Sequence, residues 1–298
     1  MSIIKSILYY IIPCKNKWPK FLIEKRLLIS FKKRVGYKMN MKNPITFNEK
    51  LQWYKINYEG DGHLENIVDK YLFKRYIKEK LGDGYTIPLL GQWSSIEQLE
   101  KDWEKLPEEF CLKSTLQSDG NCIKFIHNKS TIPFKSLQKE LKEWLNPKNT
   151  LINSFCRAYY HATPRIIAEE YMQNVKDQLY DYKFFCFDGE PYCIEAAKER
   201  FKEEETNFTF YDLNWNKLNV TSSNHPNGDV PHPIHLDEMI NLSKILSKDF
   251  PHIRVDFFDT KNKLYVAELT LYTAGGYSKY EPESFNIKMG ELFKLPLY

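Results

Sequence analysis

Glycine is scarce in this chain of 298 residues. Its twelve glycines are about 4% of the sequence, against about 7% in an average protein. Loops that cradle phosphate through backbone amides usually contain several glycines, because a missing side chain lets the amides approach the ligand. Any phosphate-binding loop in this chain must therefore work with few glycines.

Paired cysteine motifs are also missing. The six cysteines form no CxxC pair and show no zinc-ligand spacing. Several lie in apolar runs such as 184–187, where cysteine behaves as a small core residue. We expect reduced thiols in a cytoplasmic protein, without a disulfide framework.

No apolar run is long enough to span a bilayer. Residues 3–12 are apolar except for Lys5 and Ser6 and end at Pro13, whereas a spanning helix needs about 20 residues. No small-residue cleavage site follows, which disfavours a signal peptide. The main interpretation is an amphipathic helix packed on its own domain. Peripheral contact of this stretch, and of the basic residues after it, with the inner face of the membrane stays open.

The charge excess is small: 43 Lys and Arg residues against 39 Asp and Glu residues give +4. A small excess that is evenly spread does not indicate a nucleic-acid partner. Hydrophobic residues at 42% and aromatic residues at 15% support a sizeable core. This composition excludes a disordered tail, a collagen-like repeat and a polytopic membrane protein.

The first 86 residues are expected to be largely helical. The spacing of Val68, Tyr71, Leu72 and Tyr76 predicts a helix over 66–81, and Thr46 with Glu49 forms a capping-box pattern. Further helices are expected at 137–145, with Ser136 as N-cap, and at 236–250. The expected strands span 110–113, 122–126, 165–171, 181–187, 192–196, 254–258 and 264–270, with a hairpin turn at 188–189. Hairpins between helices predict an α+β fold with mainly antiparallel sheets.

The last hairpin gathers polar residues. If its strands pair about the centre of the loop 259–263, Arg254 lies opposite Glu268 and Asp256 opposite Val266. Alternation then places Arg254, Asp256, Glu268 and Thr270 on one face. Two carboxylates on neighbouring strands suit Mg²⁺, and neutralising one of them should relieve repulsion in the metal-free protein. A solvated face with cross-strand ion pairs is the alternative.

Two lysines end or interrupt apolar strands. Lys113 precedes the polar loop 114–121, and Lys183 lies among aromatic residues. A lysine that is buried there needs an anionic partner, either phosphates of ATP or nearby carboxylates. Glu169, Glu170, Tyr171 and Met172 form either an adenine-binding hinge or a strand that leaves the core.

In this order the pieces resemble a known family, the TupA-like ATP-grasp amidoligases of teichuronopeptide biosynthesis. The matching stretches are 43–53, 69–71, 87–91, 164–171, 181–189, 254–256 and 268–270. The resemblance covers nearly the whole chain and implies an ATP-grasp fold. It implies a helical region at 1–86, a small lobe at 87–172 and a large lobe with the metal site at 173–298, with ATP between the lobes.

The resemblance also implies residue roles. Lys113 and Lys183 would hold the phosphates, Glu169, Tyr171 and Met172 would line the adenine, and Asp181 would lie near the ribose. Asp256, Glu268 and Thr270 would bind Mg²⁺, with two ions expected. Arg254 and Lys183 would assist phosphoryl transfer.

The implied reaction activates a carboxylate as an acyl phosphate, which an amine then attacks. The expected substrates are ATP, a uronic-acid carboxyl of a bacterial surface polysaccharide or its precursor, and a small amine. The loop 114–121 departs from the family, since it holds one glycine and no histidine. A non-catalytic binding module of polysaccharide assembly is therefore the alternative. A glycosyltransferase is disfavoured, because 256–259 lacks the Asp-x-Asp spacing.

Overall fold

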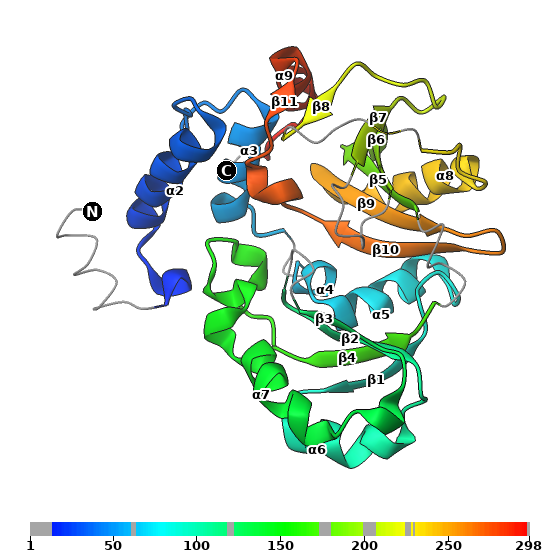
Figure 1. Cartoon of the computed structure of the whole chain (residues 1–298). Helices are drawn as coiled ribbons and strands as arrows, with labels where there is room; N and C mark the ends of the chain where they lie inside the picture. The colour runs from blue at the N-terminus through cyan, green and yellow to red at the C-terminus, as the bar shows by residue number, and fades with distance from the viewer. Residues whose placement is uncertain are drawn as a thin grey trace. The chain divides into compact units, whose positions relative to one another are not determined.

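The computed structural model describes residues 14–60, 64–117, 122–172, 180–198, 207–223, 228 and 230–296. The stretch 3–12 and residues 118–121 of the polar loop lie outside them. The chain forms two compact units and crosses between them several times (Figure 1). Unit 1 comprises Met1–Ile29, Lys55–Leu72 and Pro88–Tyr171, and unit 2 comprises Ser30–Tyr54, Phe73–Ile87 and Met172–Tyr298. The functional division at 86 and 172 stays a prediction.

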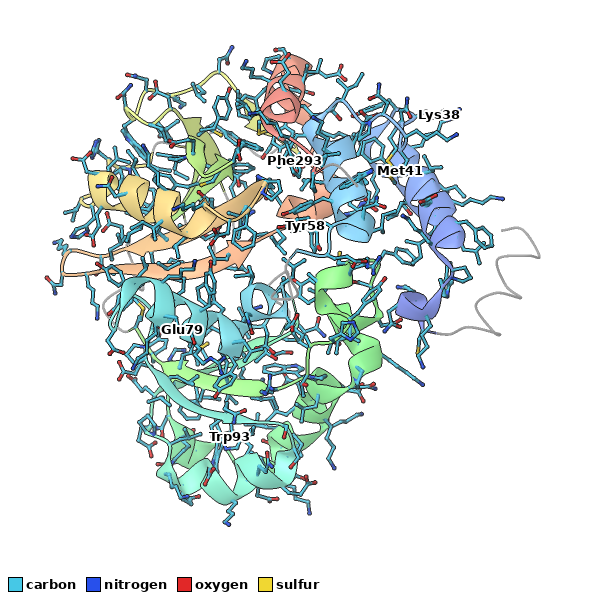
Figure 2. All side chains as sticks on the ribbon, turned by 180° about the vertical axis from the view of Figure 1, so that it is seen from behind. Lys38, Met41, Tyr58, Glu79, Trp93 and Phe293 are labelled. Atoms are coloured by element: carbon cyan, nitrogen blue, oxygen red, sulfur yellow. The ribbon has the colours of Figure 1, made fainter. Side chains whose placement is uncertain are left out.

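Unit 1 contains a four-stranded antiparallel sheet in the order β1-β4-β2-β3. Its strands are β1 (Leu89–Trp93), β2 (Phe110–Ser114), β3 (Ile123–Ile126) and β4 (Ile166–Glu170). One face packs on α6 (Ile96–Asp102) and α7 (Phe134–Leu145) around a core that includes Trp93 (Figure 2). The prediction that Ser136 caps this helix is wrong. α7 begins at Phe134, ahead of the expected start at Leu137. Pro133 occupies the N-cap position, and its φ of −61° is already close to that of a helix.

Unit 2 contains a five-stranded antiparallel sheet in the order β10-β9-β5-β6-β7. Its strands are β5 (Tyr180–Phe187), β6 (Glu190–Lys198), β7 (Asn207–Tyr211), β9 (His252–Asp259) and β10 (Leu264–Thr270). The amphipathic helix α8 (Leu236–Ser247) packs its buried residues Met239 and Leu246 on one face of this sheet. The other face carries the polar residues of the last hairpin. Together the two units confirm the α+β fold with mainly antiparallel sheets.

The remaining elements are mostly helical. They are α2 (Lys20–Val35), α3 (Phe47–Asn57), α4 (Glu65–Val68), α5 (Lys70–Leu81), α9 (Glu283–Leu292) and a small sheet of β8 (Thr221–Ser222) with β11 (Tyr280–Glu281). Short 3₁₀ turns lie at Lys15–Lys17, Trp103–Lys105, Lys129–Thr131, Pro147–Asn149, Leu151–Asn153, Arg157–Tyr159 and Thr273–Gly276. Among the described residues, no helix is both long enough and apolar enough to cross a membrane.

Local sequence signals account for several element ends. The capping box is confirmed, because the amide of Glu49 donates to Thr46 Oγ1 at 3.2 Å and the amide of Thr46 donates to Glu49 Oε2 at 3.1 Å. The hairpin at Asp188 and Gly189 is confirmed, and both residues have positive φ. The single helix expected at 66–81 is instead two helices that meet at Asp69.

The register of the last hairpin differs from the prediction. Asp256 pairs with Glu268, and Arg254 pairs with Thr270, while Val266 pairs with Phe257. At Val266, which is buried opposite Phe257, the pairing already differs from the prediction by one residue. A β-bulge at Ala267 then adds a second residue of shift before Glu268. Arg254, Asp256, Glu268 and Thr270 still share one face, as the sequence predicts.

An aromatic cluster lies at one end of that polar face. The ring of Phe47 in α3 contacts the rings of Phe187, His252 and Phe293, and His252 is fully buried. The Nδ1–H of His252 donates to the carbonyl of Cys186 at 2.9 Å. Burial lowers the pKa of His252 to about 3, so this imidazole is neutral at physiological pH.

The buried imidazole predicts a pH-dependent stability. Below pH 6.5 the unfolded chain protonates His252, whereas the folded protein resists protonation down to a pH of about 3. The free energy of unfolding should therefore fall on acidification, by at most about 1.4 kcal/mol per pH unit. His252→Phe should remove this part of the slope in urea unfolding between about pH 6 and 5. The exposed His161→Phe is the matched control, and an unchanged slope in His252→Phe would contradict the assignment.

Candidate active site

Unit 2 carries a cluster of charged side chains on the sheet face opposite to α8. Lys183 in β5 pairs in register with Glu195 of β6 on one side and with Asp256 of β9 on the other. Only 4% of Lys183 is exposed. Its Nζ contacts Asp181 and lies 3.2 Å from Asp256 Oδ2. The anionic partners that the sequence required for this lysine are thus carboxylates on its own strand and on β9.

Arg254 also forms an ion pair with Asp256. Its Nε donates to Asp256 Oδ1 at 2.7 Å and its Nη2 to Asp256 Oδ2 at 2.6 Å, a bidentate pair. Nη2 also lies 3.3 Å from Thr270 Oγ1. Burial opposes the charge of this guanidinium, but the attraction of Asp256, and then of Glu195 and Glu268, outweighs it and raises the pKa of Arg254. The arginine therefore stays charged.

This geometry reverses one expectation. The sequence suggested that neutralising Asp256 would relieve repulsion between carboxylates. In the structure Asp256 bridges the buried Lys183 and the half-buried Arg254, so its removal would leave both cations without their shared carboxylate. Glu268 is half-buried and pairs in register with Asp256. Neutralising Glu268 is still expected to relieve repulsion between the two carboxylates.

Glu195 is a member of the cluster that the sequence analysis missed. It is 8% exposed and accepts a hydrogen bond from Ser222 Oγ at 3.2 Å. Burial raises its pKa, while Arg254 and Lys183 lower it. The signal was present, since Glu195 is a lone acid between Ile194 and Ala196 in an apolar strand. An isolated acid in such a strand needs a buried cation, and Lys183 is next to it in register.

Unit 1 carries a second, smaller polar group. Lys113 in β2 and Glu169 in β4 are diagonal neighbours, with Lys113 Nζ 2.5 Å from Glu169 Oε2. Both lie on the sheet face opposite to α6 and α7. Leu89 and Phe125, which share this face by register, are 37% and 41% exposed. A charged pair beside exposed apolar side chains suits a planar ligand that carries polar edges.

Tyr171 extends this face beyond the end of β4. Its ring meets that of His127 nearly edge-on at 4.9 Å and that of Phe125 at 6.0 Å. Met172, the next residue, is half-buried. The structure thus brings Lys113, Glu169 and Tyr171 together in unit 1, and Lys183, Asp181, Arg254, Asp256, Glu268 and Thr270 together in unit 2.

The match to a family model decides the classification. The model described as TupA-like ATPgrasp matches residues 49–294. The chain belongs to the TupA-like ATP-grasp family. The matched range includes every candidate residue of both groups. The comparison with curated proteins gives no match.

Two solved ligases and a solved carboxylase domain are distantly similar to this chain. The D-alanine–D-alanine ligase of Bacillus anthracis is 15% identical with a TM-score of 0.42, over 68% of this chain and 56% of that one. The phosphoribosylamine–glycine ligase of Thermotoga maritima is 10% identical with a TM-score of 0.45, over 74% and 52%. The biotin carboxylase domain of Hydrogenobacter thermophilus 2-oxoglutarate carboxylase is 16% identical with a TM-score of 0.45, over 78% and 47%. The chain thus spans about half the length of these structures, and its function does not follow from them.

The family implies magnesium, and the donor set of unit 2 fits it. Mg²⁺ is usually held by one or two carboxylates together with phosphate oxygens and water. Asp256 and Glu268 are such a pair of directly opposed carboxylates. Among the described residues, no three Asp, Glu, His or Cys side chains gather into a metal site of their own. Phosphate oxygens would have to complete the shell, and the ion would share Asp256 with Arg254 and Lys183.

The glycine-poor loop of this family member is held by contacts from several elements. The amide of Ser114 donates to Cys122 O at 3.0 Å, and the amide of Thr115 donates to Arg165 O at 3.0 Å. Leu116 O accepts from the amide of Leu151 at 3.0 Å. Gln117 O accepts from Lys70 Nζ at 2.6 Å. Each of the residues 114–117 therefore has a backbone hydrogen bond to another segment, and none of them is a glycine.

A buried ion pair anchors this loop. Asp69 is fully buried, and its Oδ2 lies 3.0 Å from Arg165 Nη1. Its Oδ1 accepts from the amides of Tyr71 and Leu72 and so caps α5. Burial raises the pKa of Asp69, while these amides and Arg165 lower it. Since Arg165 also bonds Thr115 through its backbone, Asp69 connects the start of α5 to the loop.

Removing Asp69 should loosen the loop. Asp69→Ala takes away both the helix cap and the partner of Arg165, and we expect a loss of about 2–4 kcal/mol in the free energy of unfolding. Amide hydrogen exchange at Ser114 and Thr115 should become faster, which peptide-resolved exchange would measure.

The matched control is Arg75→Gln on the same helix. It breaks the exposed pair with Glu79, which lies at 3.2 Å, and should cost no more than about 0.5 kcal/mol. A loss of stability in Asp69→Ala without faster exchange at Ser114 and Thr115 would contradict the anchoring role.

Proposed function

We propose that this chain is an ATP-dependent carboxylate–amine ligase. The observation that carries the proposal is the buried cluster around Asp256 in a member of an ATP-grasp family. Two cations and several carboxylates on one sheet face are costly to bury for structural purposes alone. Such a face suits a ligand that brings both negative phosphates and a metal ion.

Nucleotide binding is assigned to both groups of residues. Lys113 and Lys183 bind the phosphates of ATP, and Glu169, Tyr171 and Met172 line the adenine. Asp181 lies near the ribose, although its carboxylate contacts Lys183 in the unliganded chain. The exposed side chains of Leu89 and Phe125 beside Glu169 support an adenine site, because a flat base stacks on apolar surface.

The proposed reaction has two steps. A carboxylate oxygen of the acid substrate attacks the γ-phosphorus, the bond to ADP breaks, and an acyl phosphate forms. The nitrogen of the amine then attacks the acyl carbon, inorganic phosphate leaves, and the amine loses a proton. Arg254 and Lys183 stabilise the negative charge on the transferred phosphoryl oxygens. Asp256, Glu268 and Thr270 would hold two Mg²⁺ ions, which would supply further neutralisation of that charge.

The substrates are assigned by family resemblance. The acid is a uronic-acid carboxyl of a surface polysaccharide or its precursor, and the nucleophile is a small amine. Because the reaction consumes ATP, we place it in the cytoplasm. Measuring ADP release with panels of uronic acids and amines tests this substrate assignment directly.

One observation favours a second candidate, a non-catalytic binding module of polysaccharide assembly. The loop 114–121 has one glycine and no histidine. Fewer backbone amides can then approach phosphate closely. Nucleotide binding separates the two candidates, because the ligase requires it.

Mg-ATP should stabilise the protein. A ligand that binds only the folded state at 100 times its Kd adds about 2.7 kcal/mol, which raises Tm by several degrees. Lys113→Gln should reduce the shift caused by millimolar Mg-ATP, because it removes a phosphate ligand. Lys124→Gln is the matched control: Lys124 pairs with Glu140 at 2.9 Å on the other face of the same sheet. Absence of any shift in the unmodified chain with Mg-ATP or Mg-ADP would reject the ligase.

The two carboxylates of the metal pair should respond differently. Glu268→Gln should fold normally and lose ADP release, because a metal ligand is removed without unpairing a cation. Asp256→Asn should lose ADP release and also about 3–5 kcal/mol of stability, since Arg254 and Lys183 lose their shared charge. The exposed Glu283→Gln is the control. Full turnover in Glu268→Gln would exclude this residue as a metal ligand.

A further inference from the structure

The charge of the chain is concentrated at its N-terminal end. The first 42 residues contain eleven Lys and Arg residues and a single acid, Glu24, for a net charge of +10. The whole chain carries +4, so the other 256 residues carry −6. The even spread expected from composition is therefore wrong. Such a separation of charge indicates a binding surface for an anionic partner.

The helix α2 displays part of this charge on one side. Its buried residues Ile23, Leu27 and Phe31 recur every four positions and form one apolar stripe. The exposed residues in the middle of the helix lie on the remaining circumference. These residues form the basic face of α2: Phe21, Lys25, Arg26, Ile29, Lys32 and Lys33. Figure 1 shows α2 as one long helix.

Two large apolar side chains stand within the basic face. Phe21 is 67% exposed and Ile29 is 41% exposed, and they lie eight residues apart, so helical geometry places them on similar sides. A single exposed apolar residue has no special meaning. Two of them among four cations match the pattern of helices that lie in a membrane interface, where apolar side chains enter the acyl region and cations meet lipid phosphates.

We propose that the basic face of α2 docks on an anionic phospholipid surface. The cations are complementary to the negative headgroups, and Phe21 and Ile29 find an apolar medium that a dissolved polyanion does not offer. The stretch 3–12 lies outside the described residues, so the proposal rests on α2 alone. It is also independent of the ligase activity, because no residue of the basic face belongs to either candidate group.

Sedimentation of the full chain with lipid vesicles tests the proposal. The protein should sediment with vesicles that contain phosphatidylglycerol and stay in solution with pure phosphatidylcholine. Raised salt should weaken the binding, because it screens charge. Lys25→Glu with Lys32→Glu should lower the partition coefficient at least about tenfold. Phe21→Ser with Ile29→Ser should lower it as well, while thermal unfolding stays unchanged in both variants.

The matched control is Lys135→Glu with Lys142→Glu on α7, which reverses two exposed lysines at the same spacing of seven residues. It should bind like the unmodified chain. The proposal is overturned if anionic vesicles do not sediment the protein, or if the α7 control loses binding equally. Unchanged binding of the Phe21 and Ile29 variant would also overturn it, because attraction of charge alone would then account for the sedimentation.

Discussion

The carboxylate of Asp256 is the group on which the charged face of the sheet in unit 2 depends. It is almost completely buried, and both of its oxygens are engaged by charged donors, the guanidinium of Arg254 and the ammonium of Lys183. A buried ion pair is tolerated only with good geometry, because the loss of hydration is large. The three residues lie on the adjacent strands β5 and β9, so the pairing register of these strands is fixed by charge on one face and by apolar packing on α8 on the other.

The composition of the cluster sets what it can bind. Asp181, Glu195, Asp256 and Glu268 lie on the same sheet face as Lys183 and Arg254, and burial raises the pKa of Glu195. A divalent cation would be attracted to these carboxylates, and phosphate groups would be attracted to the metal and to both basic residues. The same face therefore suits a metal–nucleotide complex better than either component alone, which is the physical basis of the proposed ligase.

Sequence patterns predicted the features that depend on near neighbours in the chain. The Thr46–Glu49 capping box and the 188–189 turn follow from residues a few positions apart, and the shared face of Arg254 and Asp256 follows from alternation within one strand. The register of β10 did not follow, because burial of Val266 decides where the bulge lies. The Asp69–Arg165 pair, 96 residues apart, and the place of Glu195 beside Lys183 require the folded chain.

Contacts between residues far apart in the sequence also hold the loop that has few glycines. A loop with few glycines keeps its shape only if its backbone groups are bonded, and residues 114–117 are bonded to four separate segments. One of them is α5, which begins in unit 1 at the Asp69 cap and from Phe73 onward belongs to unit 2. After α5, the carbonyl of Tyr85 accepts from the amide of Val266 at 2.7 Å, beside the bulge that aligns Glu268 with Asp256. A single segment thus bonds the loop after Lys113 through Lys70 and bonds the strand that carries Glu268 through Tyr85.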